Sequence, residues 1–276
     1  MARAGHKVNE SRTFGIEIEA YNVDKHTLCA ALNAAGVACF VETYNHETRY
    51  GHWKIVPDGS IQGMQSFELV SPPLKGQAGL NALKTVCRVL AACGAKVNKS
   101  CGLHVHHDAN DLTLNAWKNL CKYYMKYEET LDTLLPWSRR ANNNGTTPDG
   151  RYEHQNFCQS LRLQFATLRD GFVAIDRATD LRSLASILCA QDRYYKLNLM
   201  AFWRHGTVEV RHHSGTVDYE KIAAWVSLTQ GMLERACTRA RVQASGRTEI
   251  DQICHRMHLA EHTVKFYTAR QTAMAA

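Results

Sequence analysis

The sequence predicts an α+β fold in which a mainly antiparallel sheet carries helices on one face. Short runs that alternate apolar and polar residues recur between longer segments with helical spacing. The runs follow no regular βαβ rhythm, and two of the pairs are separated by short turn sequences typical of hairpins. With 276 residues, 45% of them hydrophobic, the chain can bury one large core. We expect one main domain over residues 1–246, with 137–192 as a possible loop or helical insertion, and a C-terminal helix over 247–276.

The first predicted strand is Thr13–Tyr21, where Glu17 and Glu19 lie on the face opposite the apolar side chains. A short helix is expected over Asp24–Ala35, because an aspartate can cap its start and Gly36 follows its end. A second strand is expected near Val37–Glu42.

Two further strands, His52–Val56 and Ser66–Ser71, are joined by the turn-forming sequence Pro57-Asp58-Gly59-Ser60. Apolar residues at helical spacing then predict a helix within Leu80–Lys96, and the strand Gly102–His107 follows it. This order is strand, helix, strand.

The clearest long helix is Thr113–Leu135, which Pro136 ends. The polar stretch Ser138–Gln155 predicts a long loop, which we expect to act as a lid or substrate loop. Two alternating runs, Lys196–Trp203 and Thr207–His213, predict a hairpin. Helices of about Asp218–Val242 and Glu249–Ala269 close the chain.

Composition sets broad limits on function. A net charge of +7 with 14 histidines favours an anionic ligand, such as a nucleotide or nucleic acid. The sequence has neither a long apolar run nor the apolar stretch of a signal peptide near its start, so we expect a cytoplasmic protein without a membrane partner. Its ten cysteines fall mostly in apolar segments, Cys237 among them, and form no C-x-x-C pair, which predicts reduced core thiols and no zinc ribbon.

Charged side chains and histidines recur on one face of four predicted strands: Glu17, Glu19, Glu68, His104, His106, Glu209 and Arg211. If these strands share a sheet, that face gathers carboxylates that repel one another unless cations or protons bind. Carboxylate oxygens with one imidazole suit Mg²⁺ or Mn²⁺. The sequence therefore predicts a divalent-cation site on this face.

Each residue also has a plain structural interpretation. A single strand glutamate is more often solvated than a ligand, and a lone histidine is more often a hydrogen-bonded core residue. Glu209 and Arg211 can form a simple ion pair. The remaining strand and turn histidines are interpreted as structural: His107, His205, His212 and His213.

A separate group near the C-terminus, Cys254, His255, His258 and His262, has the spacing of one helix face. Such a face could bind a transition metal. Because Arg256 and Lys265 lie nearby, a solvated basic face is the favoured interpretation.

Several segments, in this order, resemble the putative amidoligase family: FGIEIE, IVPDGSI, FELVSPPL, CGLHVHHDA, LPWSRRAN and HGTVEVRHHSGT. The resemblance covers roughly residues 13 to 230. That family is related to glutamine synthetase and glutamate-cysteine ligase. The resemblance therefore implies a curved, mainly antiparallel sheet with an open face for metal ions and ATP.

Transferred residue by residue, the resemblance implies five metal ligands: Glu17, Glu19, Glu68, His104 and Glu209. It places Asp58 near the metal or amine, and Arg211 on the γ-phosphate of ATP. His106, Arg139 and Arg140 would lie near the nucleotide or substrate, and Asn198 is a weaker candidate.

The resemblance implies an ADP-forming enzyme that uses ATP and Mg²⁺, with Mn²⁺ as an alternative, to join an unidentified carboxylate to an unidentified amine through an acyl phosphate. A kinase for a small molecule could use the same sheet. A non-catalytic nucleic-acid-binding or scaffold protein is the other alternative, given the basic stretch Arg235–Arg247. Substrate identity and oligomeric state do not follow from the sequence.

Overall fold

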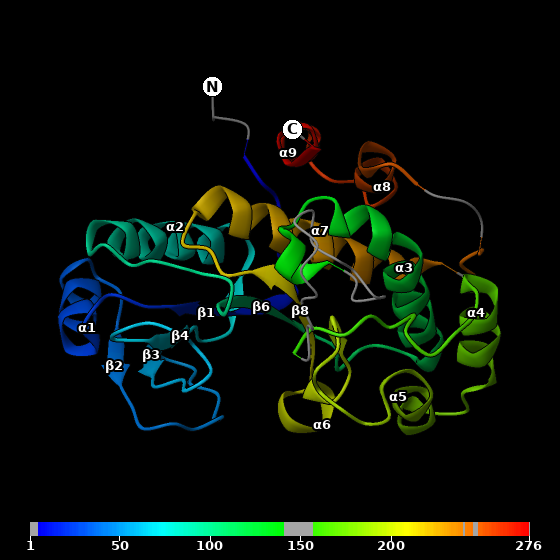
Figure 1. The fold of residues 1–276 in the computed structure, drawn as a ribbon, viewed down its shortest axis with the longest axis horizontal. Coiled ribbons are helices and arrows are strands. Elements are labelled where there is room, and N and C mark those ends of the chain that lie inside the picture. Colours follow the sequence, from blue (N-terminus) through cyan, green and yellow to red (C-terminus); the bar gives the residue numbers. More distant parts are fainter. Residues whose placement is uncertain (1–4, 141–156, 240, 245–247, 276) are drawn as a thin grey trace. The chain divides into compact units, whose positions relative to one another are not determined.

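The computed structural model describes residues 5–140, 157–239, 241–244 and 248–275 (Figure 1). The chain forms two compact units. The first, here called the sheet unit, comprises Val8–Asp108 and His213–Val226. The second, here called the helical unit, comprises the N-terminal residues up to Lys7, Ala109–His212 and Ser227–Ala276. Residues 141–155 of the predicted loop Ser138–Gln155 lie outside the described residues.

The sheet unit is built on adjacent strands in the order β2-β3-β4-β1-β6. Their bounds are Cys39–Val41, Trp53–Val56, Phe67–Val70, Thr13–Ala20 and Gly102–Asp108, and a short β5, Leu74–Lys75, also pairs with β1. β2 and β3 run parallel, whereas β3–β4, β4–β1 and β1–β6 are antiparallel. The predicted α+β class with a mostly antiparallel sheet is therefore confirmed.

Strand register gives the two faces of this sheet different chemistry. Glu17 lies opposite Val70 on one side and His104 on the other, and Glu19 lies opposite Glu68. Residues directly opposite each other in neighbouring strands project to the same face. The intervening residues of β1 (Phe14, Ile16 and Ile18) are buried on the other face. The predicted alternation of β1 is thus confirmed.

Two helices of the sheet unit follow from local sequence signals. α1, Lys25–Ala34, begins after Asp24, whose side chain accepts hydrogen bonds from the amides of His26 and Thr27. α2, Gly76–Ala92, begins four residues before the predicted Leu80. A Cβ on Gly79 would lie 3.1 Å from the Phe14 ring, so α2 packs closely on the apolar face of the sheet. It ends before Lys96, because Gly94 takes a left-handed conformation with φ of 78°.

The helical unit contains α3 (Leu114–Asp132), η1 (Trp137–Arg139), α4 (Leu168–Arg177), α5 (Leu181–Cys189), β7 (Leu197–Asn198), α6 (Ala201–His205), α8 (Ile250–Arg256) and α9 (Glu261–Ala275). β8, Thr207–Ser214, and α7, Tyr219–Thr238, each continue across the boundary between the two units. β7 and β8 pair antiparallel, with Asn198 opposite Glu209. α4 and α5, which the sequence did not locate, lie within the segment 137–192 that was expected to be a loop or helical insertion.

Two predicted elements of the helical unit are wrong. The strand expected over Lys196–Trp203 ends at Asn198, because the Asn198 side chain accepts a hydrogen bond from the Met200 amide and α6 starts at Ala201. The closing helix expected over Glu249–Ala269 is two helices. His258 lies between them with φ of 56°, so the three C-terminal histidines do not share one helix face.

All ten cysteines are reduced thiols, as predicted, and most are buried. Cys237 is exposed, so its assignment to the core is wrong. Within the described residues, none of the helices has the length and apolar character needed to cross a bilayer.

Candidate functional site

The polar face of the sheet unit brings together side chains from β1, β4, β6 and the turn after β3. We call this group the carboxylate cluster: Glu17, Glu19, Asp58, Glu68 and His104. Ligand atoms of Glu17, Glu68 and His104 all lie within 4.8 Å of one another, and so do those of Glu19, Asp58 and Glu68. Glu68 belongs to both sets. Five residues that were predicted separately along 88 positions of sequence therefore converge.

Two histidines of β6 hold Glu17 in place. The Nδ1 atom of His104 lies 2.9 Å from Glu17 Oε2, and the Nε2 atom of His106 lies 3.2 Å from Glu17 Oε1. Glu19 accepts a hydrogen bond of 2.6 Å from the Gly102 amide, and its other oxygen lies 3.5 Å from His104 Nε2. The spacing of His104 and His106 by two residues aims both rings at this face, as the sequence predicted.

The pKa values of Glu17 and Glu68 are shifted in opposite directions by their surroundings. Burial acts to raise the pKa of Glu17, but the neighbouring His106 and His104 hold it well below its usual value. Burial and the nearby Glu17, Glu19 and Asp58 raise the pKa of Glu68 well above its usual value. Carboxyl groups are thus crowded together on this face of the sheet.

Asp58 lies in the turn between β3 and β4. Its Oδ1 accepts hydrogen bonds from the amide and the hydroxyl of Ser60, both 2.7 Å long. This local turn is what the sequence Pro-Asp-Gly-Ser favours. The bonded turn leaves the Asp58 carboxylate directed toward Glu19 and Glu68.

The donor set of the cluster fits a hard divalent cation. Four carboxylates supply oxygen ligands and His104 supplies one imidazole nitrogen, which is the chemistry that Mg²⁺ or Mn²⁺ prefers. The raised pKa of Glu68 reflects its burial and the like charges around it, and the positive charge of a bound cation would act in the opposite direction. The roles of the individual residues as ligands remain predictions.

The other predicted residues lie in the helical unit. Glu209 and Arg211 project from the same face of β8, with Glu209 Oε1 2.6 Å from Arg211 Nη1. The second oxygen of Glu209 accepts a hydrogen bond of 2.5 Å from the Asn198 side chain. The ion pair proposed as the plain interpretation of Glu209 and Arg211 is therefore present.

Of the two predicted arginines, Arg139 is the last residue of η1 and Arg140 follows it, and they differ in their surroundings. Arg139 is buried, and its charge acts on the neighbouring Cys158 and His212. Arg140 donates a hydrogen bond of 3.0 Å from Nε to the Leu135 carbonyl and stacks on the Trp137 ring at 4.3 Å. Arg140 thus has a local structural role.

Sequence reasoning missed a buried ionic network in the helical unit. Lys196 is fully buried, and its ammonium donates to Glu128 (2.9 Å) and Asp132 (2.7 Å) of α3. Asp132 also contacts His212 at 2.6 Å, and His212 contacts the Tyr124 hydroxyl at 2.9 Å. One signal was available: Glu128 and Asp132 lie four residues apart on a helix face that is otherwise apolar.

A second missed residue is Lys54 of β3, which lies opposite Val70 and so projects to the same sheet face as Glu17. Its neighbours in sequence, Trp53 and Ile55, are apolar, and the run His52–Val56 was predicted only as a strand.

Comparison with known proteins identifies the family of this chain. A family described as "Putative amidoligase enzyme" matches residues 10–233. A solved structure titled "Crystal structure of novel glutamine synthase homolog" is similar at 13% sequence identity and a TM-score of 0.44, covering 98% of this chain and 67% of that chain. No curated protein matches the chain. The family match spans both the carboxylate cluster and the Glu209–Arg211 pair, and the chain belongs to the putative amidoligase family.

Proposed function

We propose that this protein is an ATP- and Mg²⁺-dependent ligase that forms an amide bond between a carboxylate and an amine. The observation that carries the proposal is the carboxylate cluster, in which two overlapping sets of three ligand atoms share Glu68. Membership in the amidoligase family supports a ligase-type role. The proposal extends this role to ATP use and to the formation of ADP.

The residues that would hold divalent cations are Glu17, Glu19, Glu68 and His104, with Asp58 beside them. Bound Mg²⁺ would supply positive charge to neutralise the phosphate oxygens of ATP. The face of the sheet that carries these residues would then be the open metal and ATP face of a glutamine synthetase-like fold. Mn²⁺ is an alternative with the same ligand preferences.

Two chemical steps follow from this proposal. An oxygen of the substrate carboxylate attacks the γ-phosphorus of ATP, which forms an acyl phosphate and releases ADP. The amine nitrogen then attacks the acyl carbon, inorganic phosphate leaves, and the amide bond is formed. The amine must lose a proton, and Asp58 or Glu19 can accept it because each is a carboxylate of the cluster.

For the helical unit we retain the roles inferred from the family resemblance. The planar guanidinium of Arg211, oriented by its ion pair with Glu209, is suited to binding the γ-phosphate. Glu209 would be a further cation ligand. Arg139 and Arg140, and His106 of the sheet unit, would contact the nucleotide or the substrate.

ADP and phosphate release tests the proposal when purified protein is supplied with ATP, Mg²⁺ and pools of amino acids, polyamines or peptides. We expect a pool to stimulate release and to yield an amide product, detected by mass spectrometry. Glu68→Ala and His104→Ala should abolish the stimulated release and leave the folded state intact. The exposed residues Glu261 and His26 provide matched controls, and Glu261→Ala and His26→Ala should retain activity.

Other outcomes point elsewhere. A phosphorylated product in place of an amide would indicate a small-molecule kinase. Wild-type activity in both cluster variants would contradict the role of the cluster. If the protein does not bind ATP, the ligase proposal is wrong.

A further inference from the structure

Lys54 occupies an unusual place on the polar face of the sheet unit. It lies opposite Val70 of β4, and Val70 lies opposite Glu17 of β1, so Lys54, Val70 and Glu17 form one row across three strands. Glu68, two residues before Val70, projects to the same face diagonally from Lys54. The side chain of Lys54 therefore shares its face with the carboxylate cluster.

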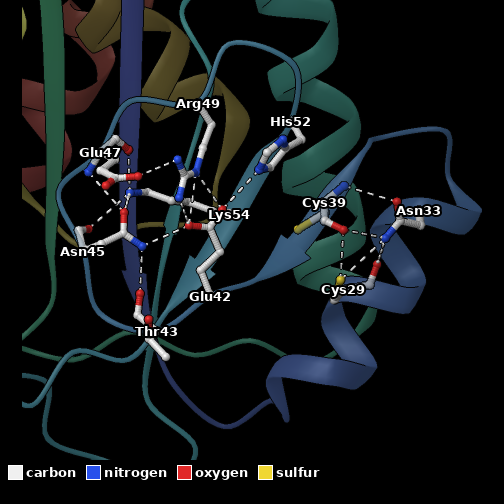
Figure 2. A network of polar contacts seen from close by, with 10 residues as sticks. All are labelled: Cys29, Asn33, Cys39, Glu42, Thr43, Asn45, Glu47, Arg49, His52 and Lys54. Carbon is white, nitrogen blue, oxygen red and sulfur yellow. Dashed lines mark hydrogen bonds and ion pairs between the residues drawn. The ribbon is translucent and has the colours of Figure 1, made fainter.

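The Lys54 ammonium is buried, and its side chain is only 2% exposed. Figure 2 shows that it reaches Asn45 and Glu47. Nζ donates to the Asn45 carbonyl at 3.1 Å, to the Asn45 side-chain oxygen at 2.8 Å and to the Glu47 carbonyl at 2.8 Å. An ammonium has three N–H donors, so these three oxygens can accept one bond each.

The segment that receives these bonds connects β2 to β3, and a second set of contacts fixes its shape (Figure 2). Arg49 bonds through Nε and Nη2 to Glu42, and through Nη1 to Glu47 at 2.7 Å. His52 Nε2 lies 3.1 Å from Glu42 Oε1, the oxygen that also accepts from Arg49 Nε. Residues 43–49 therefore lie over Lys54 in a defined conformation.

Burying a lysine costs desolvation free energy, and filling the space on β3 does not require that cost. An apolar side chain would fill the same volume on β3 without desolvating a charge. Burial lowers the pKa of Lys54, while Glu42, Glu68 and Glu17 act to raise it. The charge is thus balanced partly by the loop and partly by the carboxylate cluster.

We propose that Lys54 is a positioning residue of the candidate active site, which holds residues 43–49 against the carboxylate face and limits the net negative charge of the cluster. The segment then forms the β3 side wall of the site. This inference rests on the proposed function, because it assumes that the cluster binds divalent cations.

If the charge of Lys54 acts on the cluster, its removal should change Mn²⁺ affinity in a direction that a purely structural role does not predict. Two strand spacings of about 4.8 Å separate the Lys54 and Glu17 positions, and we therefore take about 10 Å as the separation between the ammonium and a bound dication. Removing a positive charge at that distance should tighten binding of Mn²⁺ about four- to fifteenfold, for an effective dielectric constant of about 40 to 80. Loss of packing alone would leave Mn²⁺ affinity unchanged or weaken it.

The experiment compares wild-type protein with Lys54→Met, Asn45→Ala and Lys122→Met. Lys122 is the matched control, because it too is a buried lysine but lies in the helical unit, where it contacts Asp176. Mn²⁺ affinity is measured by electron paramagnetic resonance. Opening of the segment is measured as the rate of tryptic cleavage after Arg49, followed by mass spectrometry.

We expect Lys54→Met to bind Mn²⁺ more tightly and to be cleaved faster after Arg49. Asn45→Ala should be cleaved faster with unchanged Mn²⁺ affinity, since the lysine charge remains. Lys122→Met should match wild type in both assays. If Lys54→Met does not fold, Lys54→Gln makes the same charge change with a polar end group.

Unchanged or weaker Mn²⁺ binding in the Lys54 variant, or unchanged cleavage after Arg49, would overturn this inference while leaving the proposed function in place. If wild-type protein binds no Mn²⁺, the proposed function fails and the inference fails with it. The two failures are therefore distinguished by the wild-type titration.

Discussion

Replacing Glu68 by glutamine should make the cation-free protein more stable and at the same time remove its stabilisation by Mg²⁺. The glutamine side chain has nearly the same shape but no charge. In the absence of a cation, the substitution relieves repulsion between Glu68 and its neighbours Glu17, Glu19 and Asp58. In the presence of Mg²⁺, it removes the carboxylate common to both sets of ligand atoms.

The size of the first effect follows from the geometry. Oxygen atoms of Glu68 lie within 4.8 Å of those of Glu17 and of Glu19. At that distance and an effective dielectric constant of about 40, each like-charge pair costs about 1.7 kcal/mol. Partial protonation of Glu68 and solvent screening reduce the sum, so we expect a gain of about 1 to 2 kcal/mol. For a chain of this size, that corresponds to a rise in Tm of about 2 to 8 °C.

Thermal unfolding in EDTA and in excess Mg²⁺ measures both effects. At about 100 times its Kd, Mg²⁺ should stabilise the wild-type protein by about 2.7 kcal/mol. The order of Tm values should therefore reverse, with the variant higher in EDTA and the wild type higher in Mg²⁺. The exposed control Glu261→Gln should follow the wild type in both. A variant that is less stable in EDTA, or that keeps the Mg²⁺ shift, would refute the reasoning.

Three further predictions concern the helical unit. Asp132→Asn should lower the free energy of unfolding by about 2 to 4 kcal/mol in urea denaturation, because it breaks the buried contacts to Lys196 and His212; the exposed control Glu129→Gln should cost under about 1 kcal/mol, and equal losses would contradict the assignment. Burial and the nearby Lys196 lower the pKa of His212 to about 4. Since this lies below the unfolded value of about 6.5, the unfolded state takes up the proton first, and up to about 3 kcal/mol of stability should be lost as pH falls from about 6.5 to 4. His212→Gln should flatten that pH dependence in urea midpoints, and an unchanged slope would argue against it. Ala190→Gly should raise stability by about 0.5 to 1 kcal/mol, because Ala190 ends α5 with φ of 45°, a conformation that glycine adopts more easily; a lower Tm would contradict this.

Much of the sheet unit could be predicted because its signals are local. The alternation in Thr13–Ala20 is strict, Asp24 caps α1, and the Pro57–Ser60 turn separates two strands. Alternation also fixes which side chains share a face, so Glu17, Glu19, Glu68 and His104 could be grouped before any coordinates were known. The polar face of this sheet was therefore accessible from sequence.

The features that were missed depend on contacts between distant residues. Lys196 begins a run that looks like a long strand, but the Asn198 side chain turns the chain into α6. Asp132 gains two partners, Lys196 and His212, which are 64 and 80 residues away in sequence. Lys54 is buried by a loop whose shape depends on Arg49 and Glu42. No local pattern of spacing encodes these pairings.

The most direct test of the ligase proposal follows an oxygen atom. Amino acids or peptides labelled with ¹⁸O in their carboxylates are incubated with the protein, ATP, Mg²⁺ and the amine pool that stimulates ADP release, and the phosphate is analysed by mass spectrometry. If the carboxylate attacks the γ-phosphorus and phosphate then leaves the acyl group, one phosphate is released for each amide formed, and that phosphate carries one ¹⁸O. Phosphate released without label during substrate-stimulated turnover, or retention of the phosphoryl group on a stable product, would contradict the account.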